Sequence, residues 1–170
     1  MAALITYNVK RKVHNYIGLK GVEQMIALAC DHGGFELMGE VKAYLEERGY
    51  EYRDFGTYTA ESCDYPEFAA LAARAVAGGE CERGIFICGT GVGMSIAANK
   101  VPGIRAALCS DCFTAEMTRR HNDANVIAIG ARVIGSGFAL KIIETFLNTG
   151  FSNEVRHSRR IAMLDGLDKL

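Results

Sequence analysis

Residues 84–93 read Gly-Ile-Phe-Ile-Cys-Gly-Thr-Gly-Val-Gly, so a short apolar run ends at Cys88 and three glycines then alternate with Thr90 and Val92. An apolar run of this length that ends in turn residues is typical of a buried strand. Glycines placed directly after it allow backbone N–H groups to converge on an anion. Cys88 at the rim of this loop is a candidate base or nucleophile, provided that its thiolate is accessible. The alternative is a tight strand-to-helix turn with an inert thiol, since free cysteines are often core residues.

Strand and helix patterns alternate on both sides of this segment. The expected strands are 25–30, 50–54, 84–88, 104–109 and 125–129, and the expected helices are 35–48, 67–77, 94–100, 111–121, 138–147 and 154–167. This alternation predicts a parallel sheet covered by helices on both faces. With right-handed crossovers the result is a doubly wound, Rossmann-like α/β fold, a three-layer αβα sandwich with five parallel strands. Ligands bind beyond the carboxyl ends of the strands in such folds, so we expect the site there.

Length and the N-terminal sequence suggest one domain with an extension. A chain of 170 residues fits a single domain, which we assign to residues 25–170. Residues 1–24 precede the first clear strand, and we expect them to be weakly ordered. Their apolar part, 2–9, comes before the basic residues 10–12, which is the reverse of a secretory signal.

Composition excludes several classes of protein. Lys and Arg total 19 and Asp and Glu total 20, so no basic field favours nucleic acid. No apolar run approaches the length of a membrane span. The six cysteines are scattered through a chain large enough to fold without disulfides, and we expect free thiols in a reducing cytoplasm. An anionic ligand must then be held by a few local arginines.

The glycine loop differs from the usual nucleotide-binding loops. A dinucleotide fingerprint reads G-x-G-x-x-G after the first strand, with an acidic residue about 20 positions later. Here the spacing is G-x-G-x-G and follows the third expected strand. A nucleotide- or flavin-binding module therefore remains a disfavoured alternative. Cys109 and Cys112 form a C-x-x-C without the second pair that zinc usually requires, so we expect no metal.

Other titratable residues lie where a site is expected. Asp31 and His32 follow the first strand and suggest a polar cleft, although Asp31 could instead cap the next helix. His121 lies near a helix C-terminus, where the helix dipole is a sufficient structural reason for a histidine, but it also suits proton transfer near neutral pH. Arg156 and Arg160 are four residues apart and share a helix face, either solvated or acting as a phosphate clamp.

Taken together and in this order, these residues resemble the ribose-5-phosphate isomerase B family, which also includes the subunits of galactose-6-phosphate isomerase. The resemblance extends from Met25 to about Leu164. It rests on segments 30–35 (CDHGGF), 64–66 (DYP), 87–93 (ICGTGVG), 97–100 (AANK), 103–106 (GIRA), 121–126 (HNDANV) and 156–160 (RHSRR). Residues 1–24, Cys109 and Cys112 are not part of the family's pattern.

The resemblance implies cofactor-free interconversion of ribose 5-phosphate and ribulose 5-phosphate through a cis-enediolate. It implies that Cys88 moves the proton between C1 and C2, whereas a second branch of the family has a glutamate base at the position of Met94. It further implies that His121 opens the furanose ring with help from Thr90. The enediolate would be stabilised by amides of the glycine loop: Gly89, Gly91, Val92 and Gly93.

The resemblance also assigns the rest of the site. It implies that the sugar is lined by Asp31, His32, Tyr65 and Asn122, and that the phosphate is held by Arg132, Arg156 and Arg160. Some of these residues would come from the partner subunit of a homodimer, or of a tetramer, with sites at the subunit interface.

Besides the nucleotide- or flavin-binding module, the sequence leaves two alternatives to a five-carbon isomerase. A six-carbon substrate is possible in the same family, either galactose 6-phosphate or allose 6-phosphate. The galactose enzyme divides its site residues between two different subunits, while this chain carries the whole set, which disfavours that reading. Allose 6-phosphate needs only a roomier pocket and stays open. A catalytically dead scaffold is disfavoured by the complete set of titratable groups.

Overall fold

The computed structural model describes residues 25–167. The expectation of weak order for residues 1–24 falls outside the described residues and stays a prediction. Within them the elements are β1 (Ile26–Cys30), α1 (Phe35–Glu47), β2 (Tyr52–Asp54), α2 (Tyr65–Ala77), β3 (Arg83–Cys88), α3 (Val92–Ala98), β4 (Ala106–Leu108), α4 (Cys112–Asn122), β5 (Val126–Gly130), α5 (Ser136–Asn148) and α6 (Val155–Leu167).

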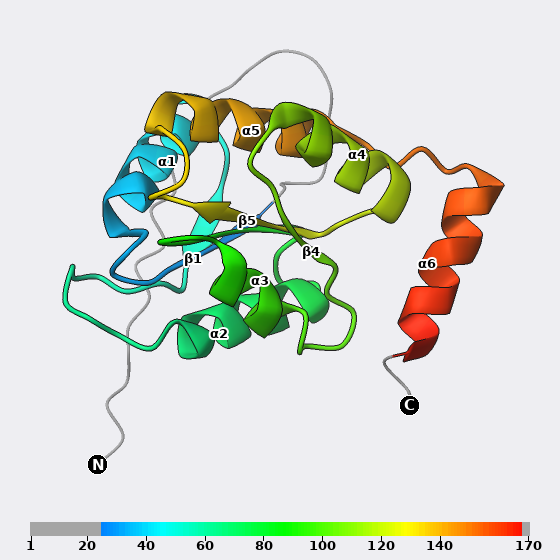
Figure 1. The fold of residues 1–170 in the computed structure, drawn as a ribbon, viewed down its shortest axis with the longest axis horizontal. Helices are drawn as coiled ribbons and strands as arrows, with labels where there is room; N and C mark the ends of the chain where they lie inside the picture. The colour runs from blue at the N-terminus through cyan, green and yellow to red at the C-terminus, as the bar shows by residue number, and fades with distance from the viewer. Residues whose placement is uncertain (1–24, 168–170) are drawn as a thin grey trace.

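The five strands form one parallel sheet in the order β2-β1-β3-β5-β4. Helices α1, α4 and α5 cover one face, and α2 and α3 cover the other (Figure 1). The predicted three-layer α/β sandwich with a five-stranded parallel sheet is confirmed. No helix among residues 25–167 combines the length and the apolar character needed to cross a membrane.

The two faces of the sheet differ because strand residues alternate. In β1, Ile26 and Leu28 point to the face covered by α1 and α5, where Phe146 is fully buried. Ala27 and Ala29 point to the other face, where the buried residues of α2 are mostly alanines. Small residues on both surfaces allow α2 to approach the sheet closely.

The registers bring three strand ends together. Cys30 of β1 pairs with Ile87 of β3, and Cys88 of β3 pairs with Gly130 of β5. The segments that follow β1, β3 and β5 therefore leave the sheet side by side, at its carboxyl edge. The crossover from β3 passes over the position of β5, so β4 becomes the edge strand.

Helix α6 lies to one side of the sandwich, beyond β4, and packs against α4 (Figure 1). His157 is its buried residue. Arg105 ties the helix to the body, because its guanidinium donates to Asp165 of α6 at 3.2 Å and to the carbonyls of Asn122 and Asp123 at the end of α4.

Candidate active site

Cys88 ends β3 with only 5% of its surface exposed, and its sulfur is held by the glycine loop. The Gly91 N–H donates to Cys88 Sγ at 3.0 Å. Gly91 has a φ of 77°, and an added Cβ would lie 2.9 Å from the carbonyl carbon of Ile129. Only glycine fits this left-handed position without strain. The turn thus directs a backbone donor at the thiol, and such a donor stabilises negative charge on sulfur.

The segment after β5 brings a cation to this loop. The Arg132 N–H donates to the Gly89 carbonyl at 2.9 Å, and the Ala131 N–H donates to the Cys88 carbonyl at 2.9 Å. A Cβ placed on Gly89 would lie 3.4–3.6 Å from the Arg132 side chain. The guanidinium therefore lies over Gly89, beside Cys88, as expected for a residue that binds an anionic ligand.

Asp31 and His32 leave β1 next to the same loop. Asp31 is buried, and its carboxylate accepts from the N–H groups of Gly33 at 2.9 Å and Gly34 at 3.1 Å. The N-cap residue of α1 is Gly34, so Asp31 holds the turn that precedes the helix rather than capping the helix itself. An added Cβ on Gly33 would lie 3.0 Å from the Gly89 nitrogen, which means that the two loops are in contact.

His32 is oriented by a residue that the sequence did not single out. The Cys63 N–H donates to His32 Nδ1 at 3.3 Å. An acceptor Nδ1 carries no proton, so the proton of neutral His32 lies on Nε2. The Cys63 sulfur also lies 4.0 Å from His32 Nδ1, but the closer contact comes from the backbone N–H, and a backbone donor leaves no signal in the sequence.

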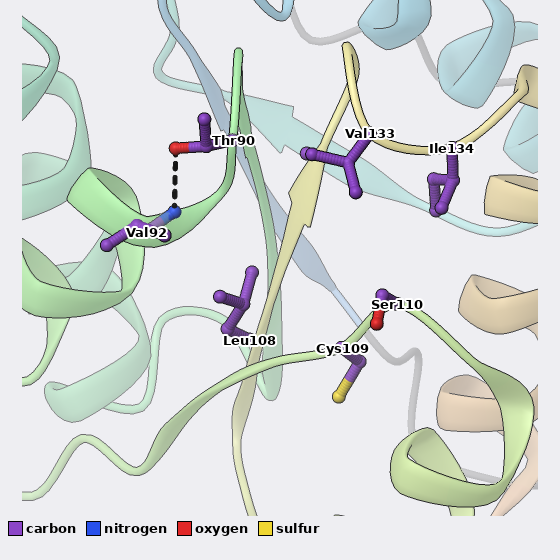
Figure 2. Close-up of a pocket in the computed structure, with 8 residues that line it drawn as sticks. Thr90, Val92, Leu108, Cys109, Ser110, Val133 and Ile134 are labelled. Atoms are coloured by element: carbon purple, nitrogen blue, oxygen red, sulfur yellow. Dashed lines mark hydrogen bonds between the residues drawn. The ribbon is translucent and has the colours of Figure 1, made fainter.

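Tyr65 and Thr90 complete this side of the site. Tyr65 begins α2, and its ring covers Gly93, where an added Cβ would lie 2.7 Å from the ring. Thr90 is exposed, and its hydroxyl accepts from the Val92 N–H at 3.4 Å (Figure 2). Thr90 and Val92 line a mostly apolar pocket of about 240 Å³ that is completed by Leu108, Cys109, Ser110, Gly130, Val133 and Ile134.

The structure thus gathers one set of predicted residues at the carboxyl edge of the sheet, which we call the cysteine group. It comprises Asp31, His32, Tyr65, Cys88, Gly89, Thr90, Gly91, Val92, Gly93 and Arg132. The remaining predicted residues form a second set, the histidine group. It comprises His121, Asn122, Arg156 and Arg160.

The two groups are separated within one chain. Helix α4 starts at the carboxyl edge after β4 and runs back, so its last residues, His121 and Asn122, lie near the beginning of β5. β5 begins at Val126 and reaches the carboxyl edge only at Gly130, roughly 13 Å away at the usual rise of a strand. A single chain therefore does not bring His121 to Cys88.

The histidine group centres on a contact between two imidazoles. The ring centroids of His121 and His157 lie 4.4 Å apart with the planes inclined by 41°. His157 is only 2% exposed, and its Nδ1 lies 2.7 Å from Ser152 Oγ. Burial is the largest effect on His157 and lowers its pKa. Glu154 opposes this by raising the pKa, whereas His121, Arg156 and Arg160 lower it further.

His157 is the second residue that the sequence did not single out. It lies inside the segment 156–160, where the arginines at 156 and 160 drew the interpretation. The signal in the sequence was its position directly after Arg156 in the expected helix. The structure shows that it faces inward, whereas the arginines of this segment are exposed.

The other buried cysteines lack the environment of Cys88. Burial raises the pKa of Cys30 to about 12 and that of Cys109 to about 12. Cys81 is raised to a pKa of about 11, also mainly by burial. All six cysteines are free thiols. In the part of the chain that the structure describes, no three His, Cys, Asp or Glu side chains are arranged to hold a metal ion.

Comparison with known proteins gives consistent matches over almost the whole described region. The sequence profile of the Ribose/Galactose Isomerase family matches residues 26–164. Ribose-5-phosphate isomerase B of Escherichia coli (strain K12) is 48% identical over 144 residues, covering 85% of this chain and 96% of that protein.

Two solved structures extend the comparison to three dimensions. Ribose-5-phosphate isomerase B of Clostridium thermocellum has a TM-score of 0.84 and 51% identity, covering 86% of this chain and 98% of that one. The enzyme of Mycoplasma genitalium with bound ribulose 5-phosphate has a TM-score of 0.83 and 36% identity, covering 88% and 99%.

Proposed function

The chain belongs to the ribose/galactose isomerase family, and from that premise we propose that it interconverts ribose 5-phosphate and ribulose 5-phosphate without a cofactor. The five-carbon substrate is supported by 48% identity to a ribose-5-phosphate isomerase B over nearly the full length of that protein. It is also supported by the likeness to a structure that holds ribulose 5-phosphate.

The observation that carries the proposal is the hydrogen bond from the Gly91 N–H to Cys88 Sγ, 3.0 Å long, at the mouth of the glycine loop. In the aldose-to-ketose direction, the thiolate of Cys88 takes the proton from C2 of the open-chain sugar. The C2–H electron pair forms the C1–C2 double bond, and the carbonyl oxygen on C1 becomes the enediolate oxygen. The thiol then returns the proton to C1 while the proton on O2 passes to O1, which leaves a ketone at C2.

The surrounding groups favour this charge movement. Negative charge develops on O1 and O2 in the transition state, where preorganised backbone N–H groups are most effective. The glycines at 89, 91 and 93 allow the backbone to approach these oxygens closely. Arg132 lies over Gly89 and adds a positive charge to the same side. His32, with its proton on Nε2, is suited to donate to a sugar hydroxyl.

Ring opening and phosphate binding need groups that the cysteine group lacks. The furanose opens when a base takes the proton from the C1 hydroxyl and an acid protonates the ring oxygen, and an imidazole titrates in the right range for this. We assign this step to His121 and phosphate binding to Arg156 and Arg160, together with Arg132. Thr90, whose hydroxyl is exposed beside Cys88, assists the ring opening.

The site is incomplete in one chain, and we propose that it is built between two chains. A twofold dimer places the cysteine group of each copy against the histidine group of the other. Exposed apolar residues line the pocket beside Thr90, including Val133 at 59% and Val92 at 43% exposure. A second groove of about 350 Å³, which includes Asn122, separates α6 from the edge strand β4. Both surfaces suit burial against a second copy.

An isomerase assay across sugar phosphates tests the proposed reaction. We expect the highest kcat/KM for ribose 5-phosphate, a lower value for allose 6-phosphate and galactose 6-phosphate, and little turnover of unphosphorylated ribose. In D2O the ketose formed should carry deuterium at C1, because the transferred proton sits on a thiol that exchanges with solvent. A higher kcat/KM for a six-carbon sugar phosphate would show that this sugar, and not ribose 5-phosphate, is the preferred substrate. Absence of turnover with every sugar phosphate would overturn the proposal.

We also propose that the protein works in the reducing cytoplasm. Its six cysteines are all free thiols, and the reaction requires Cys88 in the reduced form. Oxidation of Cys88 would remove the base.

A further inference from the structure

The imidazole of His157 lies against the imidazole of His121 and is the more deeply buried of the two. The centroids are 4.4 Å apart, and His157 is 2% exposed whereas His121 is half-buried. His157 is the buried residue of α6 as far as the structure describes that helix. A polar ring in that place is costly unless it has partners, and a leucine would fill the space without that cost.

Ser152 holds the buried ring. The Ser152 hydroxyl lies 2.7 Å from His157 Nδ1 and accepts from the Glu154 N–H at 3.3 Å. The hydroxyl thus contacts both the imidazole and the backbone of the segment that leads into α6. The Ser152 N–H in turn donates to the Arg120 carbonyl at 3.1 Å, which fixes the segment before α6 to α4, beside His121. The His157 ring is therefore held by its own helix, α6, and, through Ser152, by α4.

We propose that His157 is a positioning residue, which holds the His121 imidazole in the orientation that ring opening requires. The inference rests on the proposed function, because it concerns a step of that reaction. His157 acts through His121 and does not itself reach the sugar. Charged groups near the pair come from α6, as Arg156 and Arg160, and from the segment before it, as Glu154. His157 thereby joins the ring-opening residue on α4 to the phosphate-binding arginines on α6.

The chemistry of the two substrates separates this role from a merely structural one. Ribose 5-phosphate is a furanose and must be opened, whereas ribulose 5-phosphate is open-chain because its C5 hydroxyl is esterified. A defect in ring opening therefore slows the aldose-to-ketose direction. The reverse direction can release the open-chain aldose, which closes in solution.

The test uses the full-length protein and three variants, His157→Leu, His157→Phe and Ser158→Ala. His157→Leu removes the ring, and we expect kcat for ribose 5-phosphate to fall by roughly tenfold or more while kcat for ribulose 5-phosphate stays within about twofold. His157→Phe keeps an aromatic ring against His121 and should recover most of the loss. Ser158→Ala, at the exposed neighbour on the same helix, should behave as the wild type.

Two results would overturn the proposal. An equal fall in both directions, or a rise in KM alone, would mean that His157 only keeps α6 and its arginines in place. Wild-type rates for folded His157→Leu would mean that the contact has no role in the reaction. If His157→Leu does not fold, His157→Phe and His157→Asn give the same comparison, with the loss expected for Asn.

A measurement without substrate separates failure of this inference from failure of the proposed reaction. The imidazole NMR signals of His121 should shift in His157→Leu and shift less in His157→Phe. Unchanged His121 signals in His157→Leu would refute positioning even if the enzyme is active. A wild-type protein without isomerase activity would instead refute the reaction while the NMR contact persists.

Discussion

Cys88 differs from the other buried cysteines in what its sulfur contacts. Burial raises the pKa of Cys30 and Cys109 to about 12, which keeps both as thiols at neutral pH. Cys88 is also buried, at 5% exposure, but its sulfur accepts from the Gly91 N–H at 3.0 Å. A loop that supplies a donor to a sulfur is suited to a thiolate, which is the form that abstracts a proton.

Removing this sulfur tests the assignment of the base. In Cys88→Ala we expect kcat to fall by about 10²–10⁴-fold, the usual contribution of a positioned general base. Cys88→Ser should be similarly impaired, since a hydroxyl is a far weaker acid than a thiol. Steady-state kinetics give the rates, and thermal unfolding should show intact folding. Cys30→Ala is the matched control for deleting a buried thiol, and Cys88→Ala with activity near that control would exclude Cys88 as the base.

Gly91 is required by both its backbone angle and its surroundings. Gly91→Ala places a methyl group 2.9 Å from the Ile129 carbonyl carbon at a φ of 77°. The left-handed angle alone costs about 1–2 kcal/mol, and the overlap adds about 1–3 kcal/mol. Gly103→Ala is the matched control, because its φ is 82° and no atom lies within 4 Å of the added Cβ.

Denaturant unfolding at one protein concentration gives the free energy of unfolding of the two glycine variants. The free energy of unfolding should fall further for Gly91→Ala than for Gly103→Ala, and the difference isolates the overlap from the backbone strain. Activity should fall only in Gly91→Ala, because its N–H no longer points at Cys88. Equal losses of stability would show that the contacts of the added methyl group with Leu108 and Ile129 relax without cost.

At the scale of elements, the sequence predicted the helices and strands better than their ends. Helix α3 begins at Val92 rather than at the expected residue 94, because Gly91 in the left-handed region serves as its N-cap. Strand β4 is limited to Ala106–Leu108 instead of 104–109. It lies at the edge of the sheet, and the side chain of Asn99 bonds both the N–H and the carbonyl of Ala106, in place of a further strand. Such tertiary contacts are not encoded in local periodicity.

The start of α4 gives a prediction for this helix, which carries His121. Asp111 is the N-cap residue and accepts from both the N–H and the hydroxyl of Thr114. These hydrogen bonds lower the pKa of Asp111. A lowered pKa in the folded state means that the stabilisation is fully present above the ordinary aspartate pKa and is lost as the pH falls through the folded value.

Thermal unfolding of Asp111→Ala and Asp111→Asn across pH tests this cap. Near pH 7 the wild type should unfold at a higher temperature than Asp111→Ala, with Asp111→Asn between them, because asparagine also caps helices. The advantage of the wild type over Asp111→Asn should begin to shrink below about pH 4, the ordinary aspartate pKa, and should be lost as the pH falls through the lowered pKa of the folded state. An advantage that is constant over the whole acidic range would show that the charge of Asp111 contributes nothing.

For the whole molecule, the sequence indicated where the site lies but not how it is divided. The rule that ligands bind at the carboxyl ends of parallel strands correctly brought together Asp31, Cys88 and Arg132. The strand order β2-β1-β3-β5-β4, and with it the place of α4 and α6, depends on long-range pairing that periodicity does not contain. The separation of His121 from Cys88 therefore became visible only in three dimensions.

This separation predicts that two inactive variants restore each other. In the proposed dimer, each site takes Cys88 from one copy and His121 from the other. A mixed dimer of Cys88→Ala and His121→Asn has one site with both substitutions and one site with neither. Random exchange of equal amounts makes half of the dimers mixed, so about a quarter of the sites become wild type.

Unfolding and refolding the two variants together allows that exchange, and the aldose-to-ketose rate measures the outcome. The refolded mixture should reach about a quarter of the wild-type rate, well above either variant refolded alone. The control refolds Cys88→Ala together with Cys88→Ser, which cannot form an intact site in any combination. If size-exclusion chromatography shows mixed dimers and the rate stays at the level of the single variants, the two groups do not meet across an interface. The chain would then have to rearrange internally to bring His121 to Cys88, against the hydrogen bonds of Arg105 and Ser152 that hold α4 and α6 where they lie.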